Sequence, residues 1–212
     1  DLNAGEKPKP TTMALVHPDG RVALAADDLS FPNGTVITPD GRTLIVGETM
    51  AARLTAFDVA GDGTLSNRRV WAQLENAVPD GICLDAEGAI WVASPVSQAV
   101  LRVREGGEVL DRIDVETNAY ACMLGGADRR TLFLCTAQDH DPAKTGTHRG
   151  RIEAVQVAKR ALATVGIDAT TLEANAALRS IVRRDTGEGY QDFLTQLAQA
   201  SGVDHSTISR LI

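Results

Sequence analysis

Short apolar runs alternate with polar turns over residues 13–157, and this pattern predicts an all-β fold. The first two runs, 15–17 and 22–26, flank the step Pro18-Asp19-Gly20, which is typical of a hairpin turn. Downstream, the predicted strands form three groups: 35–38, 43–47, 53–59 and 68–74; then 82–84, 89–93, 100–104 and 109–115; then 121–124, 131–136 and 151–157.

These groups recur at a regular distance along the chain. Leu44, Ile90 and Leu132 take corresponding places in the three groups and are 46 and 42 residues apart. Four short strands per 40 to 45 residues are the signature of a β-propeller blade. A propeller closes as a ring of at least four blades, and about three are predicted here. Because the chain starts at Asp1 in the middle of this pattern, we expect further blades upstream.

Two of the groups open on the same step, Pro32-Asn33-Gly34 in one and Pro79-Asp80-Gly81 in the next. In both, a turn glycine follows the Asx residue after eight positions, at Gly41 and Gly88. Two side chains that carry oxygen therefore hold equivalent places in consecutive repeats, which would aim them at one point. The alternative is that both Asx residues only cap turns before glycine.

The pattern changes after residue 157. Apolar residues then follow helical spacing, as in Tyr190, Phe193, Leu194, Leu197 and Ala198. We therefore predict two parts, an all-β part over 1–157 and an α-helical segment over 158–212.

Charge and cysteine content narrow the function classes. The net charge of −7 belongs to residues 1–157, because residues 158–212 hold equal numbers of acidic and basic side chains. This argues against nonspecific nucleic-acid binding and suits a cation or a small neutral substrate. Cys83, Cys122 and Cys135 lie in apolar runs, so we expect them in the core of a cytoplasmic protein. No apolar stretch reaches the ~20 residues of a membrane helix.

The motifs around the two Asx steps, with Asp62-Gly63-Thr64-Leu65, Gly125-Gly126 and Thr131-Leu132-Phe133, resemble the SMP-30/gluconolactonase/LRE-like family over about residues 13–157. The resemblance implies a metal-dependent hydrolase (lactonase) with a six-bladed propeller that opens sugar-acid lactones or related esters. It also implies one divalent cation, with calcium expected first and zinc, manganese or magnesium as alternatives. Asn33 and Asp80 match metal ligands of the family, and Asp80 matches the favoured general base. The family's further ligand, a glutamate, and its substrate contacts lie in upstream blades, so the chain resembles a truncated C-terminal half whose activity is doubtful.

Other residues are weaker candidates. Asn118 and Tyr120 precede the first strand of the third group, and we expect them at the channel mouth as substrate contacts. Glu48 could also face the channel, but a solvated loop carboxylate is the favoured interpretation. His140, in a polar loop, is interpreted as a loop residue.

The C-terminal segment has its own resemblance. Residues 164–202 resemble a stretch of DDE-type transposases, with Asp168 in the place of a first metal-binding carboxylate. The other two carboxylates of such a site are absent, so we expect no activity from it. Two further hypotheses stay open: a noncatalytic propeller part that associates with another chain through open sheet edges, and a DNA-binding regulator that uses residues 197–211 as a helix-turn-helix.

Overall fold

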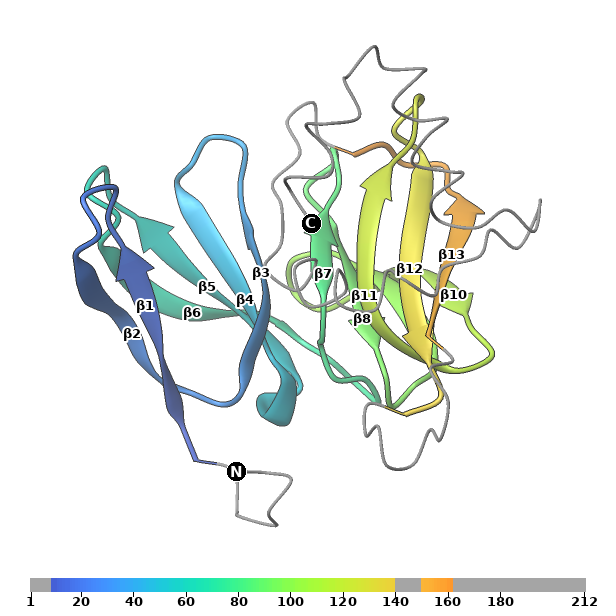
Figure 1. Ribbon diagram of the computed structural model, residues 1–212, viewed down its shortest axis with the longest axis horizontal. Coiled ribbons are helices and arrows are strands. Elements are labelled where there is room, and N and C mark those ends of the chain that lie inside the picture. The colour runs from blue at the N-terminus through green and yellow to red at the C-terminus, as the bar shows by residue number, and fades with distance from the viewer. Residues whose placement is uncertain (1–8, 140–149, 162–212) are drawn as a thin grey trace, which may run out of the picture.

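A computed structural model describes residues 9–139 and 150–161 of the chain. Within these ranges the protein has thirteen β-strands in four antiparallel sheets, one 3-10 turn and no α-helix (Figure 1). The predicted all-β arrangement is therefore confirmed for this part. The predicted helices, the transposase-like residues, the helix-turn-helix and His140 lie outside the described residues.

The strands follow the predicted groups closely. A two-stranded sheet holds β1 (Thr11–Val16) and β2 (Val22–Leu29). The first blade holds β3 (Pro32–Ile37), β4 (Thr43–Glu48), β5 (Arg53–Val59) and β6 (Leu65–Gln73), with the 3-10 turn η2 (Thr49–Ala51) after β4. The second blade holds β7 (Ile82–Leu84), β8 (Ile90–Ser94), β9 (Ala99–Val103) and β10 (Val109–Asp114). The third blade holds β11 (Asn118–Gly125), β12 (Thr131–Ala137) and β13 (Arg151–Gln156).

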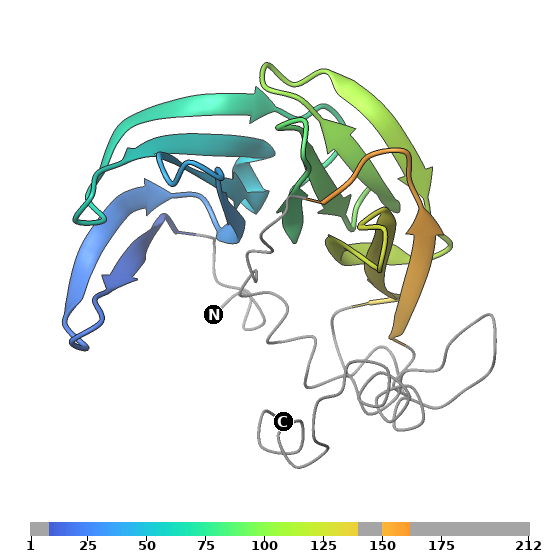
Figure 2. The same cartoon turned by 90° about the horizontal axis from the view of Figure 1, so that it is seen from above.

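The four sheets stand side by side in an arc (Figure 2). In each blade the strands run outward in chain order, so that β3, β7 and β11 are the inner strands. β7 contacts both β3 and β11, which lie on either side of it. Residues at the start of these three strands are therefore brought together, although the first residues of the strands are 50 and 36 positions apart in the sequence.

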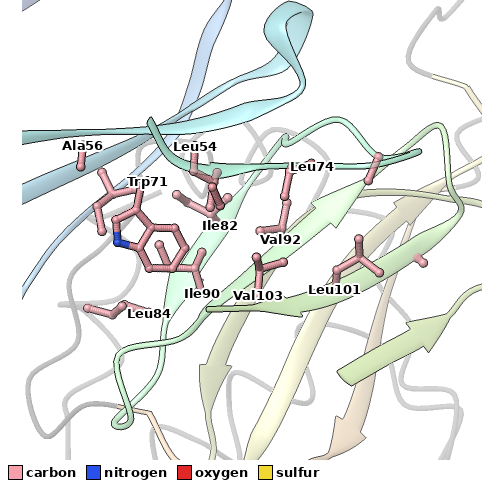
Figure 3. Packing of buried hydrophobic residues seen from close by; sticks show 14 residues of the cluster. Leu54, Ala56, Trp71, Leu74, Ile82, Leu84, Ile90, Val92, Leu101 and Val103 are labelled. Carbon is pink, nitrogen blue, oxygen red and sulfur yellow. The ribbon is translucent and has the colours of Figure 1, made fainter. Parts of the chain in front are cut away.

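Apolar side chains fill the space between neighbouring blades. Leu54 and Trp71 of the first blade meet Ile82, Ile90 and Val92 of the second (Figure 3). A second cluster joins the second and third blades and includes Cys83, Trp91, Cys122, Leu132 and Leu134. Every residue of β8 and β9 is buried, because these strands have a sheet on each face. The second blade is thus the most enclosed part of the described structure.

The residues after the third blade return to the second. Ala161 is buried and forms a β-bridge with Asp85, and the Ala86 N–H donates to the Arg160 carbonyl at 2.9 Å. Residues 158–161, which the sequence assigns to the helical segment, therefore contact the β-part. In the described part of the chain, no helix is long and apolar enough to cross a membrane.

Candidate functional site

Backbone hydrogen bonds join the three inner strands at matched positions. The Gly34 N–H donates to the Asp80 carbonyl at 3.0 Å, and the Gly81 N–H donates to the Tyr120 carbonyl at 2.8 Å. Asn33, Asp80 and Tyr120 therefore hold equivalent places in successive blades. The sequence repeat relates only the first two, because Tyr120 has neither the proline nor the glycine of the Pro-Asx-Gly step.

The glycine of each step lets the next inner strand approach. A Cβ on Gly34 would lie 2.5 Å from the Asp80 carbonyl oxygen, and a Cβ on Gly81 would lie 2.7 Å from the Ala121 Cα. Backbone atoms cannot move aside as a flexible side chain can. In the third blade the corresponding residue is Ala121, which has a side chain. The need for glycine therefore applies to Gly34 and Gly81, which pack against the next blade in the described residues.

The side chain of Asn33 bonds to the turn that follows the neighbouring strand β4. Its Nδ2 donates to the Thr49 Oγ1 at 3.4 Å, and the Thr49 hydroxyl donates to the Pro79 carbonyl at 2.7 Å. Thr49 opens η2 and belongs to the first blade, whereas Pro79 precedes Asp80 at the entry to the second. A chain of two hydrogen bonds therefore connects the Asn33 amide with the backbone next to Asp80.

Asp80 lies between the other two positions, at the entry to the short strand β7. Its N–H donates to the Ala93 carbonyl of β8 at 2.9 Å, and its carbonyl accepts from Gly34. The residue is half-buried, and both its backbone N–H and its backbone carbonyl are used in hydrogen bonds.

Asn118 and Tyr120 contact each other in the third blade. The Asn118 Nδ2 donates to the Tyr120 hydroxyl at 3.3 Å and to the Gln138 carbonyl at 3.1 Å. Both residues are half-buried, and their hydrogen bond shows that the two side chains lie on the same side of β11. The bond from Gly81 to Tyr120 places this pair next to the Asp80 step.

Glu48 is buried, so the interpretation as a solvated loop carboxylate is wrong. It ends β4, where it accepts from the Ser30 N–H at 2.7 Å, from the Arg53 Nε at 2.9 Å and from the Thr55 hydroxyl, and it pairs with Arg68 at 3.3 Å. Burial alone raises the pKa of Glu48, but the hydrogen bonds from Arg53, Ser30 and Thr55 outweigh it and lower the pKa to about 2. The arginines come from β5 and β6, so no motif around Glu48 could reveal them.

The donor atoms at the inner strands are oxygens, the type of ligand that a hard divalent cation prefers. An amide oxygen from Asn33 and a carboxylate from Asp80 are the ligands that calcium and magnesium prefer, whereas zinc favours nitrogen and sulfur. In the described ranges, no three His, Cys, Asp or Glu side chains gather where they could hold a metal ion. Calcium takes six to eight oxygen atoms, so this pair fits as part of a coordination shell.

Fold and site together define a propeller-type β protein that presents oxygen donors from neighbouring inner strands. Residues 1–138 match the protein family described as the SMP-30/Gluconolactonase/LRE-like region. The chain belongs to this family.

Individual relatives agree with this assignment. The chain is 32% identical over 138 residues to regucalcin of Danio rerio, covering 62% of this chain and 47% of that protein. It is 29% identical over 148 residues to 6-deoxy-6-sulfogluconolactonase of Pseudomonas putida, covering 68% and 49%. The crystal structure of a calcium-binding protein, regucalcin, from Agrobacterium tumefaciens superimposes with a TM-score of 0.59 at 23% identity, covering 71% of this chain and 54% of that one. The chain thus spans about half the length of the curated relatives it matches.

Proposed function

We propose that this chain is part of a metal-dependent hydrolase of the gluconolactonase type, which opens sugar-acid lactones or related esters. One observation carries the proposal: Asn33 and Asp80 bring hard oxygen donors to equivalent places on inner strands that the bond from Gly34 to Asp80 holds together. The family name and the sulfogluconolactonase of Pseudomonas putida support a lactone substrate. The calcium-binding relative supports calcium as the cation.

The residues would divide the reaction between them. Asn33 and Asp80 would hold the cation, which when bound polarises the lactone carbonyl and lowers the pKa of a nearby water. As the oxygen of that water bonds to the carbonyl carbon of the lactone, Asp80 accepts a proton from the water. The ring C–O bond then breaks, and the proton passes from Asp80 to the alkoxide that leaves.

Tyr120 and Asn118 would orient the substrate. An amide nitrogen can only donate, so the Tyr120 hydroxyl is the acceptor in its bond with Asn118. The hydroxyl keeps its own proton, which it can donate to a hydroxyl or carboxylate oxygen of a sugar acid. Because Asn118 is held in turn by the Gln138 carbonyl, the phenol is positioned before substrate binds.

Asp80→Asn is the direct test of this assignment. The substitution keeps the size of the side chain but removes the base and the charge, so we expect lactone hydrolysis by the full chain with calcium to fall by about 10²-fold or more. Asp111→Asn, on the exposed strand β10, is the matched control and should leave the rate unchanged. An Asp80→Asn chain that hydrolyses lactone as fast as the parent would contradict the mechanism.

A noncatalytic propeller part that associates with another chain is the second candidate. The sheet β1–β2 exposes Val16, Val22 and Leu24, with 65%, 68% and 65% of their surfaces accessible. In the blades, such apolar faces are covered by a neighbouring sheet, and exposed patches of this kind mark interaction sites. Sedimentation of the parent chain should then show a complex, and Val22→Lys together with Leu24→Lys should dissociate it. A parent chain that is a monomer throughout a 100-fold dilution series starting at ~0.1 mM excludes self-association.

A further inference from the structure

We infer that Thr49 is a positioning residue, which turns the Asn33 amide so that its oxygen and not its nitrogen faces the candidate cation site. The inference rests on the proposed function, because it concerns a ligand of the cation proposed there. It adds a residue that no sequence motif indicates, since Thr49 lies outside both Pro-Asx-Gly steps.

The argument starts from the single proton of the Thr49 hydroxyl. That proton is used in the bond to the Pro79 carbonyl at 2.7 Å, because a carbonyl oxygen can only accept. Toward Asn33, the Thr49 Oγ1 therefore has only lone pairs to offer. An amide oxygen in the same place would meet those lone pairs without a proton between them. The Asn33 Nδ2 must take this position, which directs the Oδ1 away from Thr49.

Thr49 is itself held firmly. Its N–H donates to the Phe31 carbonyl at 3.0 Å, and its carbonyl accepts from the Ala52 N–H at 3.2 Å. The preceding residue is the buried Glu48, whose carboxylate is tied to Arg53 and to the Ser30 N–H. Because the backbone of Thr49 is fixed by these bonds, its hydroxyl can orient the Asn33 side chain and does not move with it.

Close packing brings Thr49 to the second blade. A Cβ on Gly47 would lie 2.9 Å from the Pro79 Cβ, so the absence of a side chain at Gly47 lets the end of β4 approach Pro79. Thr49 then bonds to Pro79 directly before Asp80. One hydroxyl thus orients the Asn33 side chain and also ties it to the backbone that carries Asp80.

Substitutions at Thr49 separate this role from a contribution to stability. Thr49→Val keeps the shape and removes the hydroxyl, which frees the Asn33 amide to rotate, and we expect the full chain to bind calcium about 10-fold more weakly, as for the loss of one oriented ligand. Thr49→Ser keeps the hydroxyl and should bind like the parent. Calcium affinity is measured by calorimetry without lactone, and urea unfolding monitors the fold.

The same substitution in an Asn33→Asp background gives a readout that a merely structural role would not change. A carboxylate has two equivalent oxygens and no nitrogen that Thr49 could hold, so Thr49→Val should not weaken calcium binding in this background. An equal loss in both backgrounds overturns the inference, as does an unchanged affinity of the Thr49→Val chain.

NMR of the parent chain tests the inference even where Thr49→Val does not fold. On addition of calcium, the Asn33 side-chain carbonyl carbon should shift, while its Nδ2 protons should keep their hydrogen-bonded positions. The reverse pattern overturns the inference. A chain that binds calcium in this way but hydrolyses no lactone would contradict the proposed function alone, whereas a parent chain that binds no calcium contradicts both.

Discussion

The two complete blades begin with the same Pro-Asx-Gly step but use it differently. In both, the glycine N–H bonds to the next inner strand, and its Cα lies too close to that strand for a side chain. The Asx side chains are not alike: Asn33 is an amide held by Thr49, whereas Asp80 is a carboxylate on a residue whose backbone bonds to Gly34 and Ala93. The glycine thus serves the packing of the inner strands in both blades, whereas the side chain before it differs between them.

The blades also bury different carboxylates at different ends. Glu48 lies opposite Pro32 in the β3–β4 register, at the same end as Asn33, and pairs with arginines from β5 and β6. Asp85 lies at the far end of β7 from Asp80 and bonds to the Nε of the buried Arg102 at 2.7 Å. The first blade therefore anchors the segment that carries Thr49, and the second anchors the turn that meets residues 158–161.

The largest effect is expected from removing one of these buried charges. Glu48→Gln leaves Arg53 and Arg68 without their counter-charge, so the free energy of unfolding should fall by about 3–5 kcal/mol. Urea unfolding measures the loss. Glu108→Gln, which breaks an exposed pair with Arg104, is the control and should cost less than about 1 kcal/mol. Similar losses for the Glu48 and Glu108 substitutions would contradict the anchoring role.

Acid should remove the contribution of Glu48 to the free energy of unfolding, as the Glu48→Gln substitution does. The pKa of Glu48 is lowered from an ordinary value of 4.5 to about 2 in the folded chain, so the carboxylate stabilises the fold above pH 4.5. This contribution should disappear as the pH falls from about 4.5 to 2. The difference in unfolding free energy between the parent and Glu48→Gln should therefore shrink over this range. A difference that stays constant between pH 6 and pH 2 would refute the lowered pKa.

A side chain on the step glycine should be the next most damaging change. Gly34→Ala places a Cβ against the Asp80 carbonyl oxygen and the Ile82 backbone nitrogen, and overpacking of this kind costs about 1–3 kcal/mol. Gly61→Ala is the control, because nothing lies within 4 Å of its added Cβ. Thermal unfolding of both chains decides the point, and equal melting temperatures would mean that the shared glycine is not needed for packing of the inner strands.

The smallest effect on the fold is expected in the third blade. Tyr120→Phe removes the hydroxyl and leaves the ring, so stability should change by less than about 1.5 kcal/mol, the value of one hydrogen bond. For lactone hydrolysis, KM should rise by about threefold to tenfold with a smaller change in kcat, as expected for loss of a substrate contact. Steady-state kinetics measure both, and an unchanged KM would remove Tyr120 from the site.

The amino-acid sequence was sufficient for much of this structure. Strand positions follow from local alternation and turn residues, and β7 coincides with the predicted run 82–84. The recurrence of Leu44, Ile90 and Leu132 predicted the blades, and the repeated step selected Asn33 and Asp80. These signals lie within a few residues of each other or recur at a fixed period, which is why they can be read without a structure.

The sequence predicted Asn118 and Tyr120 as substrate contacts, but only the tertiary structure decided which residues lie next to Asn33 and Asp80. Tyr120 became equivalent to Asp80 through the backbone bond from Gly81 to Tyr120, two residues that are 39 positions apart and share no motif. Thr49 and Glu48 bond to partners on the next blade and on other strands, which lie far from them in the sequence. Neighbouring inner strands meet only when the blades pack face to face. Burial of the apolar faces of whole blades brings the residues at the starts of these strands together, and no local sequence preference does so.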